Sequence, residues 1–167
     1  MTNEQPAGGV DEARRAAMAA ASKRIDQVQN WLQVGGAIAP DDYERLRAAG
    51  VTHIVDLREE HEVDADSARL TQLGIERRHV PVPNRHAPTT PQMLDVIDWF
   101  PADTDDVSLY VHCQGGFGRA GTMAVGLLVQ SGLTLEQAEQ EVRAVRPEIN
   151  INDEQRAWLQ SLEQGRA

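Results

Sequence analysis

The chain has 167 residues, the size of a single domain with one hydrophobic core. Its 16 lysines and arginines against 26 aspartates and glutamates give a net charge of −10, which argues against a nucleic-acid-binding protein with a basic face. The longest apolar run, residues 123–129, is far shorter than the roughly 20 residues that a membrane span needs. Residues 1–6 also lack the basic start and apolar stretch of a signal peptide. We therefore expect a cytoplasmic protein with no nucleic-acid or membrane partner.

Residues 1–24 are expected to form a leader, disordered over residues 1–9 and then weakly helical, because residues 10–24 are rich in alanine and arginine. Short apolar runs predict strands at residues 28–34, 51–57, 75–82 and 107–112. Capping signals and spaced apolar residues predict helices at residues 40–49, 59–73, 90–100, 119–130, 134–146 and 152–162. Strands that alternate with helices predict one α/β domain over residues 25–167, with a central, mostly parallel sheet flanked by helices.

The helix predicted at residues 90–100 follows a segment with three prolines, residues 83–91, which must be a loop. The helix is expected to turn four apolar side chains toward the core: Met93, Leu94, Ile97 and Phe100.

The residues that could carry chemistry gather after the strand that ends at His112. Cys113, the chain's single cysteine, is separated from Arg119 by five residues, three of them glycine. Glycines let backbone N–H groups turn toward one point, and the start of a helix adds free N–H groups and partial positive charge. Arg119 adds a planar fork of donors that suits two phosphate oxygens. The segment therefore predicts a cup for a tetrahedral oxyanion, with the cysteine sulfur at its base.

The positive field of this cup favours the thiolate form of Cys113, which is the nucleophilic form. A thiolate beneath a bound phosphate is placed for in-line attack, and the product is a phosphocysteine intermediate. His112 is expected to hold Cys113 through hydrogen bonds. The residues between Cys113 and Arg119 form the expected phosphate-binding loop: Gln114, Gly115, Gly116, Phe117 and Gly118. The alternative is that Cys113 is a small buried core residue.

The run from His112 to Arg119 resembles the HCx5R signature loop of the cysteine-based protein tyrosine phosphatases, and its surroundings resemble the small dual-specificity group. Further runs are similar to that group, in its order: residues 31–36, 42–46, 50–58, 80–83 and 146–149. The resemblance covers about residues 28–162. It implies a phosphatase-type layered domain, Cys113 as the nucleophile, Arg119 as the phosphate ligand, and no metal or other cofactor. It also implies a phosphorylated protein or a small aryl phosphate as the substrate.

Two positions depart from the pattern of that family. Its general acid is an aspartate in a mobile loop upstream of the cysteine, and the matching loop here has Asn84 or Arg85 at that position. Neither donates a proton usefully near neutral pH, and His86 is the best substitute because an imidazolium does. Ala120 stands where many members carry a hydroxyl that helps the sulfur leave, so both departures predict slow turnover. Three aspartates are weaker candidates for the acid: Asp56, Asp95 and Asp98.

Basic side chains near the expected pocket mouth are interpreted as a patch that steers anionic substrates, with a solvated strand end as the alternative. They are Arg77, Arg78, His79, Arg85 and His86. The signature loop itself has no lysine, which disfavours phosphoinositides because family members that act on polyphosphorylated lipids carry one there.

The leading function is hydrolysis of phosphotyrosine-type monoesters, and the alternative is a phosphate-binding pseudophosphatase with little turnover. An arsenate reductase is less consistent with the sequence, because that chemistry passes a disulfide to further cysteines and the chain has one cysteine.

Overall fold

A five-stranded sheet lies at the centre of the computed structural model, which describes residues 7–165. The strands are β1 (Ile25–Gln29), β2 (Leu32–Gly35), β3 (His53–Asp56), β4 (Glu76–His79) and β5 (Leu109–His112). The helices are α1 (Ala7–Ser22), α2 (Tyr43–Ala48), α3 (Ser67–Gln72), α4 (Thr90–Trp99), α5 (Arg119–Gln130), α6 (Leu135–Val145) and α7 (Asp153–Gln164). Two 3-10 turns complete the elements: η1 (Pro40–Asp42) and η2 (Glu60–Glu62).

The strand order is β1-β2-β5-β3-β4, with β1 antiparallel to β2 and all other neighbours parallel. This confirms the predicted α/β fold with a mostly parallel sheet. The central strand, β5, lies between β2 and β3, so the segments that follow these parallel strands meet at one edge of the sheet. Ligands of open α/β sheets bind at that edge.

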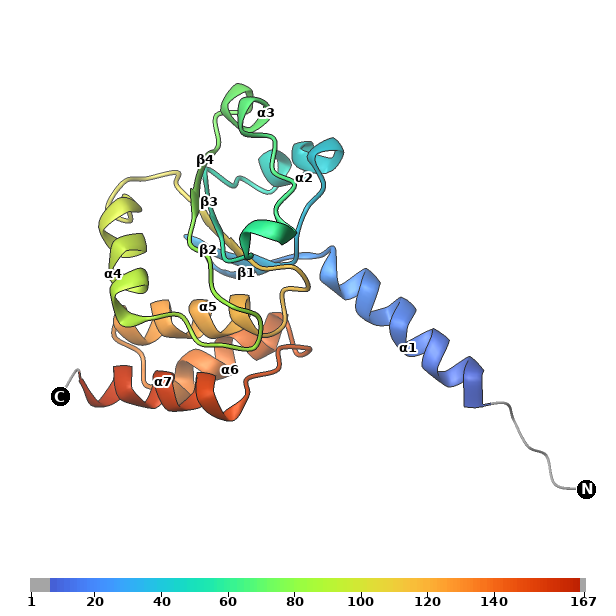
Figure 1. Ribbon diagram of the computed structural model, residues 1–167. Helices are drawn as coiled ribbons and strands as arrows, with labels where there is room; N and C mark the ends of the chain where they lie inside the picture. The colour runs from blue at the N-terminus through green and yellow to red at the C-terminus, as the bar shows by residue number, and fades with distance from the viewer. Residues whose placement is uncertain (1–6, 166–167) are drawn as a thin grey trace, which may run out of the picture.

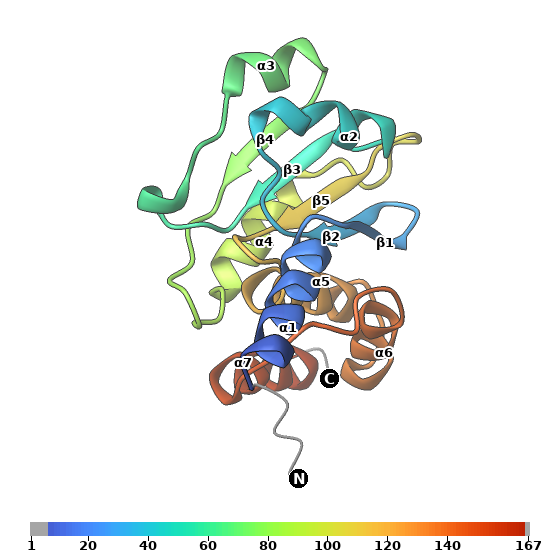
Figure 2. The ribbon, with the colours of Figure 1, turned by 90° about the vertical axis from the view of Figure 1, so that its right-hand side faces the viewer.

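The helices form two layers on the sheet (Figures 1 and 2). Helices α4, α5, α6 and α7 cover one face, and α2 and α3 cover the other. Successive side chains of a strand point to opposite faces, so Val55 and Val111 join the core beneath α5, whereas Ile54 and Tyr110 pack with Tyr43 beneath α2. Helix α5 is buried along its length between the sheet and helices α6 and α7, which fixes the position of its N-terminus.

Helix α1 projects away from the rest of the protein (Figure 1). It begins at Ala7, three residues before the predicted start, and Ala21 is its one buried side chain among residues 8–22. Residues 1–6 of the predicted disordered leader lie outside the described part of the chain. The domain boundary at residue 25 stays a prediction. Within residues 7–165, none of the helices has the length and apolar character needed to cross a membrane.

Three predictions about local structure are wrong. Residues 28–34 do not form one strand, because the chain turns at residues 30–31 and divides them between the antiparallel strands β1 and β2. Leu94 and Ile97 do not face the core, because α4 turns Met93 and Val96 inward and leaves Leu94 42% and Ile97 37% exposed. The charged segment 59–73 is not one helix, because η2 and α3 are separated by an extended stretch. Asp66 caps α3 by accepting the backbone N–H of Arg69, and this cap starts a new helix there.

Candidate active site

The loop between β5 and α5 wraps its backbone around the sulfur of Cys113. Cys113 is 3% exposed, and its Sγ accepts the backbone N–H of Gly116 at 3.2 Å. Gly116 has a φ of +80°, and a Cβ at this position would overlap the backbone of Gly35. Both observations require glycine there. The loop ends at Gly118, the N-cap of α5, so the free N–H groups of that helix face the same region as the sulfur.

Arg146 holds this loop from behind. Its side chain is fully buried, and its Nε and Nη2 donate to the carbonyl oxygens of Gly116 at 2.7 Å and Gly115 at 3.1 Å. Its Nη1 binds Asp26 Oδ2 at 2.9 Å, and its guanidinium lies 5.0 Å from the ring centroid of Phe117. Because Arg146 draws these carbonyls toward itself, the peptide N–H groups of the loop are left to face the sulfur.

His112, at the end of β5, supports Cys113 through the backbone. Its Nδ1 donates to the carbonyl oxygen of Cys113 at 3.0 Å, since that oxygen only accepts. Its Nε2 lies 3.8 Å from Asp56 Oδ2. Burial lowers the pKa of His112, which keeps the ring neutral near pH 7. The structure therefore places His112 beneath the loop as a neutral donor.

Arg119 is oriented by a carboxylate that sequence reasoning missed. Glu62, on η2, binds Nη1 at 2.8 Å and Nη2 at 2.9 Å, and the carbonyl oxygen of Val82 accepts a further bond from Nη1 at 3.0 Å. The Arg119 side chain is 3% exposed. Hydrogen bonds from Arg119 lower the pKa of Glu62 to about 2, so the pair is ionic at neutral pH. Within residues 7–165, no protein group accepts from Nε–H or the second Nη2–H of Arg119, and these two donors form a fork for an oxyanion.

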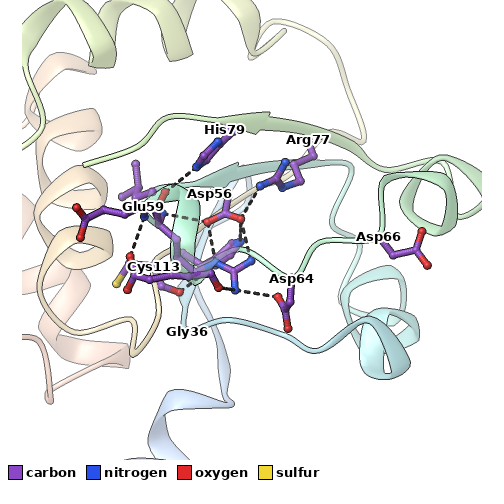
Figure 3. Close-up of polar contacts among 12 residues, drawn as sticks. Gly36, Asp56, Glu59, Asp64, Asp66, Arg77, His79 and Cys113 are labelled. Carbon is purple, nitrogen blue, oxygen red and sulfur yellow. Dashed lines mark hydrogen bonds and ion pairs between the residues drawn. The ribbon is translucent and has the colours of Figure 1, made fainter. Parts of the chain in front are cut away.

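Asp56 belongs to a buried ion cluster beside the loop (Figure 3). It is fully buried and binds Arg58 at 2.9 Å and Arg77 at 2.8 Å, while Arg58 also binds Asp64 at 2.9 Å. Burial alone would raise the pKa of Asp56, but the two arginines outweigh burial and hold this pKa well below its usual range. Asp56 is therefore an ion-pair partner without a proton to donate at neutral pH.

A pocket of about 650 Å³ opens over the sulfur. It brings together residues of the β5–α5 loop, the upstream loop of residues 83–88, and the segment before α7. Its lining consists of Glu62, Asn84, Arg85, Cys113, Gln114, Gly115, Phe117, Gly118, Arg119, Asn150, Asn152 and Gln155. Of the predicted phosphate-binding loop, Gly116 is absent from this lining because it contributes its backbone to the sulfur from behind.

The upstream loop is held against α7 by hydrogen bonds from side chains at the start of that helix. Asn152 Nδ2 donates to the carbonyl of Arg85 at 2.7 Å, and Gln155 Nε2 donates to the carbonyl of His86 at 3.2 Å. The two candidate acid positions, Asn84 and Arg85, line the pocket, but His86 does not. The His86 ring lies 3.1 Å from Glu154 Oε1 and is directed to α7. Asp95 and Asp98 are also outside the pocket lining.

The position after Arg119 offers no hydroxyl to the sulfur. Ala120 is fully buried at the start of α5, and the next hydroxyl along the helix, that of Thr122, donates to the carbonyl of Gly118 at 2.8 Å. The Thr122 hydroxyl therefore donates its hydrogen bond to the backbone at the start of α5 rather than to the sulfur.

One group of possible metal ligands lies beside the pocket. Glu59, His61 and Glu62 bring ligand atoms within 4.8 Å of one another. Both oxygens of Glu62 already accept hydrogen bonds from Arg119, so this carboxylate is paired with the guanidinium of Arg119.

Among the charged residues of the site, Glu62 and Arg146 are those that sequence reasoning did not find. A topological signal existed for Glu62: residues that follow β3 must lie beside the loop after β5 once these strands are neighbours. For Arg146 the signal was weaker, because a basic residue before a proline at the end of a helix is typical of a solvated C-terminus. The structure instead buries it completely.

Comparison with known proteins places the chain in a family. A family model described as "PTP-SAK: Swiss Army Knife protein, DSP-PTPase phosphatase domain" matches residues 33–167. The phosphatidylglycerophosphate phosphatase PTPMT2 of Arabidopsis thaliana is 26% identical over 142 residues, which are 82% of this chain and 61% of that protein. Dual specificity protein phosphatase 19 of Mus musculus is 30% identical over 130 residues, 77% of this chain and 57% of that protein. The chain spans between 38% and 61% of the length of these and similar curated relatives.

Solved structures give the same result. The crystal structure of Tk-PTP in the active form matches with a TM-score of 0.76 and 28% identity, over 85% of this chain and 97% of that chain. The crystal structure of PTPMT1 matches with a TM-score of 0.77 at 20% identity, over 85% and 95% of the two chains, and shows the shared fold. With the HCx5R loop, the layered fold and the family match together, the chain belongs to the dual-specificity phosphatase group of the cysteine-based protein tyrosine phosphatase superfamily.

Proposed function

We propose that the protein hydrolyses phosphomonoesters through a phosphocysteine intermediate, and that its substrates carry phosphotyrosine or another aryl phosphate. The observation that carries this proposal is the shared pocket of Cys113 and Arg119 at the N-terminus of α5. The sulfur supplies a nucleophile, and the loop N–H groups with the free fork of Arg119 supply the oxyanion donors.

In the first half-reaction the phosphoryl group lies over the sulfur, and its oxygens accept hydrogen bonds from the loop and from Arg119. The thiolate of Cys113 attacks phosphorus in line, the S–P bond forms, and the P–O bond to the leaving group breaks with its electron pair. A phenol has a pKa near 10, so a phenolate leaves without a protein acid. A serine or threonine alkoxide is far more basic, and we expect such esters to react slowly because Asn84 donates no useful proton.

In the second half-reaction water attacks the phosphocysteine, the S–P bond breaks, and the thiolate returns as inorganic phosphate leaves with the proton. Two groups that would speed this step are missing. The upstream loop presents Asn84 and Arg85 to the pocket in place of a carboxylate base, and Ala120 gives the departing sulfur no hydroxyl. We expect hydrolysis of the intermediate to limit turnover.

A pseudophosphatase that binds phosphate without turnover is the alternative that these same missing groups support. Lipid phosphates are a further candidate, because two curated relatives are phosphatidylglycerophosphate phosphatases. The absence of lysine from residues 114–118 favours a monophosphate over a polyphosphorylated lipid.

Release of phosphate from three substrates tests the proposal: a phosphotyrosyl peptide, the matching phosphothreonyl peptide, and phosphatidylglycerophosphate. We expect turnover of the phosphotyrosyl peptide, at least tenfold less on the phosphothreonyl peptide, and none in Cys113→Ser. Vanadate binding by Cys113→Ser checks that this variant keeps its pocket. Binding without turnover in the unsubstituted protein would instead establish the pseudophosphatase, and preference for the lipid would replace the proposed substrate class.

A further inference from the structure

Most side chains of the basic patch predicted from the sequence have hydrogen-bond or ion-pair partners in the structure. Arg77 binds the buried Asp56 at 2.8 Å. Arg78 binds Asp95 Oδ2 at 3.3 Å and lies over the ring of Trp99. The remaining two partnered members are histidines: His79 contacts the carbonyl of Arg58 at 2.6 Å, and His86 lies 3.1 Å from Glu154.

Arg85 is the exception among the arginines of this patch. Among residues 7–165 its guanidinium has no carboxylate within ion-pair distance, its side chain is exposed, and it lines the same pocket as Cys113 and Arg119. Of the three arginines of the predicted patch, Arg85 alone is unpaired within residues 7–165, and it lies at the pocket on the loop opposite the phosphate-binding loop.

The backbone of Arg85 is held in an unfavourable conformation. Its φ is +69°, in the left-handed region that a long side chain rarely adopts. Asn152 stabilises this conformation by donating Nδ2 to the Arg85 carbonyl at 2.7 Å. A strained residue whose surroundings hold it in place at a pocket indicates that its direction matters to function.

The charges of the pocket require a further cation. Glu62 neutralises Arg119 through two hydrogen bonds, and the thiolate of Cys113 adds one negative charge in the proposed chemistry. Without Arg85, an anionic substrate would enter a pocket whose lining side chains carry a net negative charge. Arg85 restores neutrality, and the loop N–H groups then favour the anion.

We propose that Arg85 binds a second anionic group of the substrate, the carboxylate of an acidic residue next to the phosphotyrosine. This rests on the proposed function of the site. The cavity of about 650 Å³ has the size of a site for a whole small molecule, so the reacting phosphoryl group occupies one part of it and leaves room for a neighbouring group at Arg85. A single exposed ion pair of this kind changes affinity by roughly two- to fivefold.

The test measures binding to Cys113→Ser, so that it does not depend on turnover. Two fluorescent phosphotyrosyl peptides, identical except for glutamate or glutamine on both sides of the phosphotyrosine, are titrated by anisotropy at low salt. We expect the glutamate peptide to bind about two- to fivefold more tightly. Adding Arg85→Asn, which tolerates a positive φ, should bring the ratio to about one. Arg85→Asp should make the glutamate peptide the weaker ligand.

Arg78→Asn is the matched control, because it removes the same charge from a basic residue outside the pocket lining. It should leave the ratio unchanged, since the Arg78 guanidinium pairs with Asp95.

The proposal is overturned if the ratio of the two peptide affinities is the same in Cys113→Ser as in Cys113→Ser that also carries Arg85→Asn. Equal weakening of both peptides by Arg85→Asn would also overturn it, by showing that Arg85 holds the reacting phosphoryl group. Failure of both peptides to bind, with retention on phosphatidylglycerophosphate vesicles, would overturn it in favour of a lipid substrate. If the unsubstituted protein shows no turnover but the affinity ratio depends on Arg85 as expected, only the proposed hydrolysis is rejected.

Discussion

The two loops that form the pocket are built differently. The loop of residues 113–118 is held from behind by buried groups: Arg146 binds two of its carbonyls, and the backbone of Gly35 packs against Gly116. The upstream loop of residues 83–88 is exposed over most of its length and is held by hydrogen bonds from Asn152 and Gln155.

In the proposed mechanism the two loops have different tasks. The loop of residues 113–118 binds the phosphoryl group, and the loop of residues 83–88 is where a proton-transfer group is expected. In the proposed chemistry, the loop of residues 113–118 and Arg119 supply the groups that hold an oxyanion over Cys113. The upstream loop presents Asn84 and Arg85 to the pocket, where the resemblance to the family leads us to expect an aspartate. Substitutions in the first loop and its supports should therefore remove activity, whereas a substitution in the second should add it.

The largest effect is expected from Arg146→Ala. This change leaves Asp26 with the exposed Arg24 as its partner and frees the carbonyls of Gly115 and Gly116, so the loop N–H groups lose their fixed direction. We expect at least a hundredfold loss of kcat/KM on an aryl phosphate and about 3–5 kcal/mol less stability in urea unfolding. Arg143→Ala, at a half-exposed arginine of the same helix, is the control and should change stability by less than about 1 kcal/mol. Activity within tenfold of the unsubstituted protein would show that the loop of residues 113–118 keeps its conformation without Arg146.

The next effect is a gain in activity from Asn84→Asp. A positioned general acid contributes about 10²–10⁴-fold, and partial recovery should raise turnover at least tenfold. The pH profile of turnover should gain an acidic limb, on which activity falls as the new carboxylate, the base for water in the limiting step, takes up a proton. His86→Ala is the companion variant, and it should leave turnover nearly unchanged because the ring is directed to Glu154. If Asn84→Asp has no effect and His86→Ala removes activity, then His86 is the acid after all.

The smallest effect concerns the acid stability that Glu62 provides. Its pKa is about 2 in the folded protein, below the usual value near 4.5, so its stabilising effect is complete above pH 4.5 and disappears as the pH falls toward 2. Glu62→Gln should cost about 1–3 kcal/mol at pH 7, and the difference from the unsubstituted protein should shrink steadily in urea titrations between pH 4.5 and 2. Glu60→Gln, at an exposed position of the same turn, is the control. A pH-independent difference would mean that the carboxylate charge is not what matters.

The parts of the fold that were predictable from the sequence are those with local causes. Helix α5 has the predicted bounds, because glycines precede it and its apolar residues are continuous. The capping box of Thr134 and Gln137 starts α6 as predicted. The missed features depend on distant contacts. Glu62 meets Arg119 through the pairing of β3 with β5, and Leu94 is exposed because Met93 and Val96 set the inward face of α4.

Under the proposed mechanism, Cys113 becomes phosphorylated during turnover and the phosphocysteine is then hydrolysed slowly. Rapid-quench mass spectrometry of the unsubstituted protein with an aryl phosphate tests it most directly. We expect one added phosphoryl group on the peptide that contains Cys113, present within the first turnover and persisting at steady state. Ala120→Ser should lower its amount, because the hydroxyl helps the sulfur leave. Steady release of phosphate without any phosphorylated Cys113 peptide, or with equal rates in Cys113→Ser, would contradict the account.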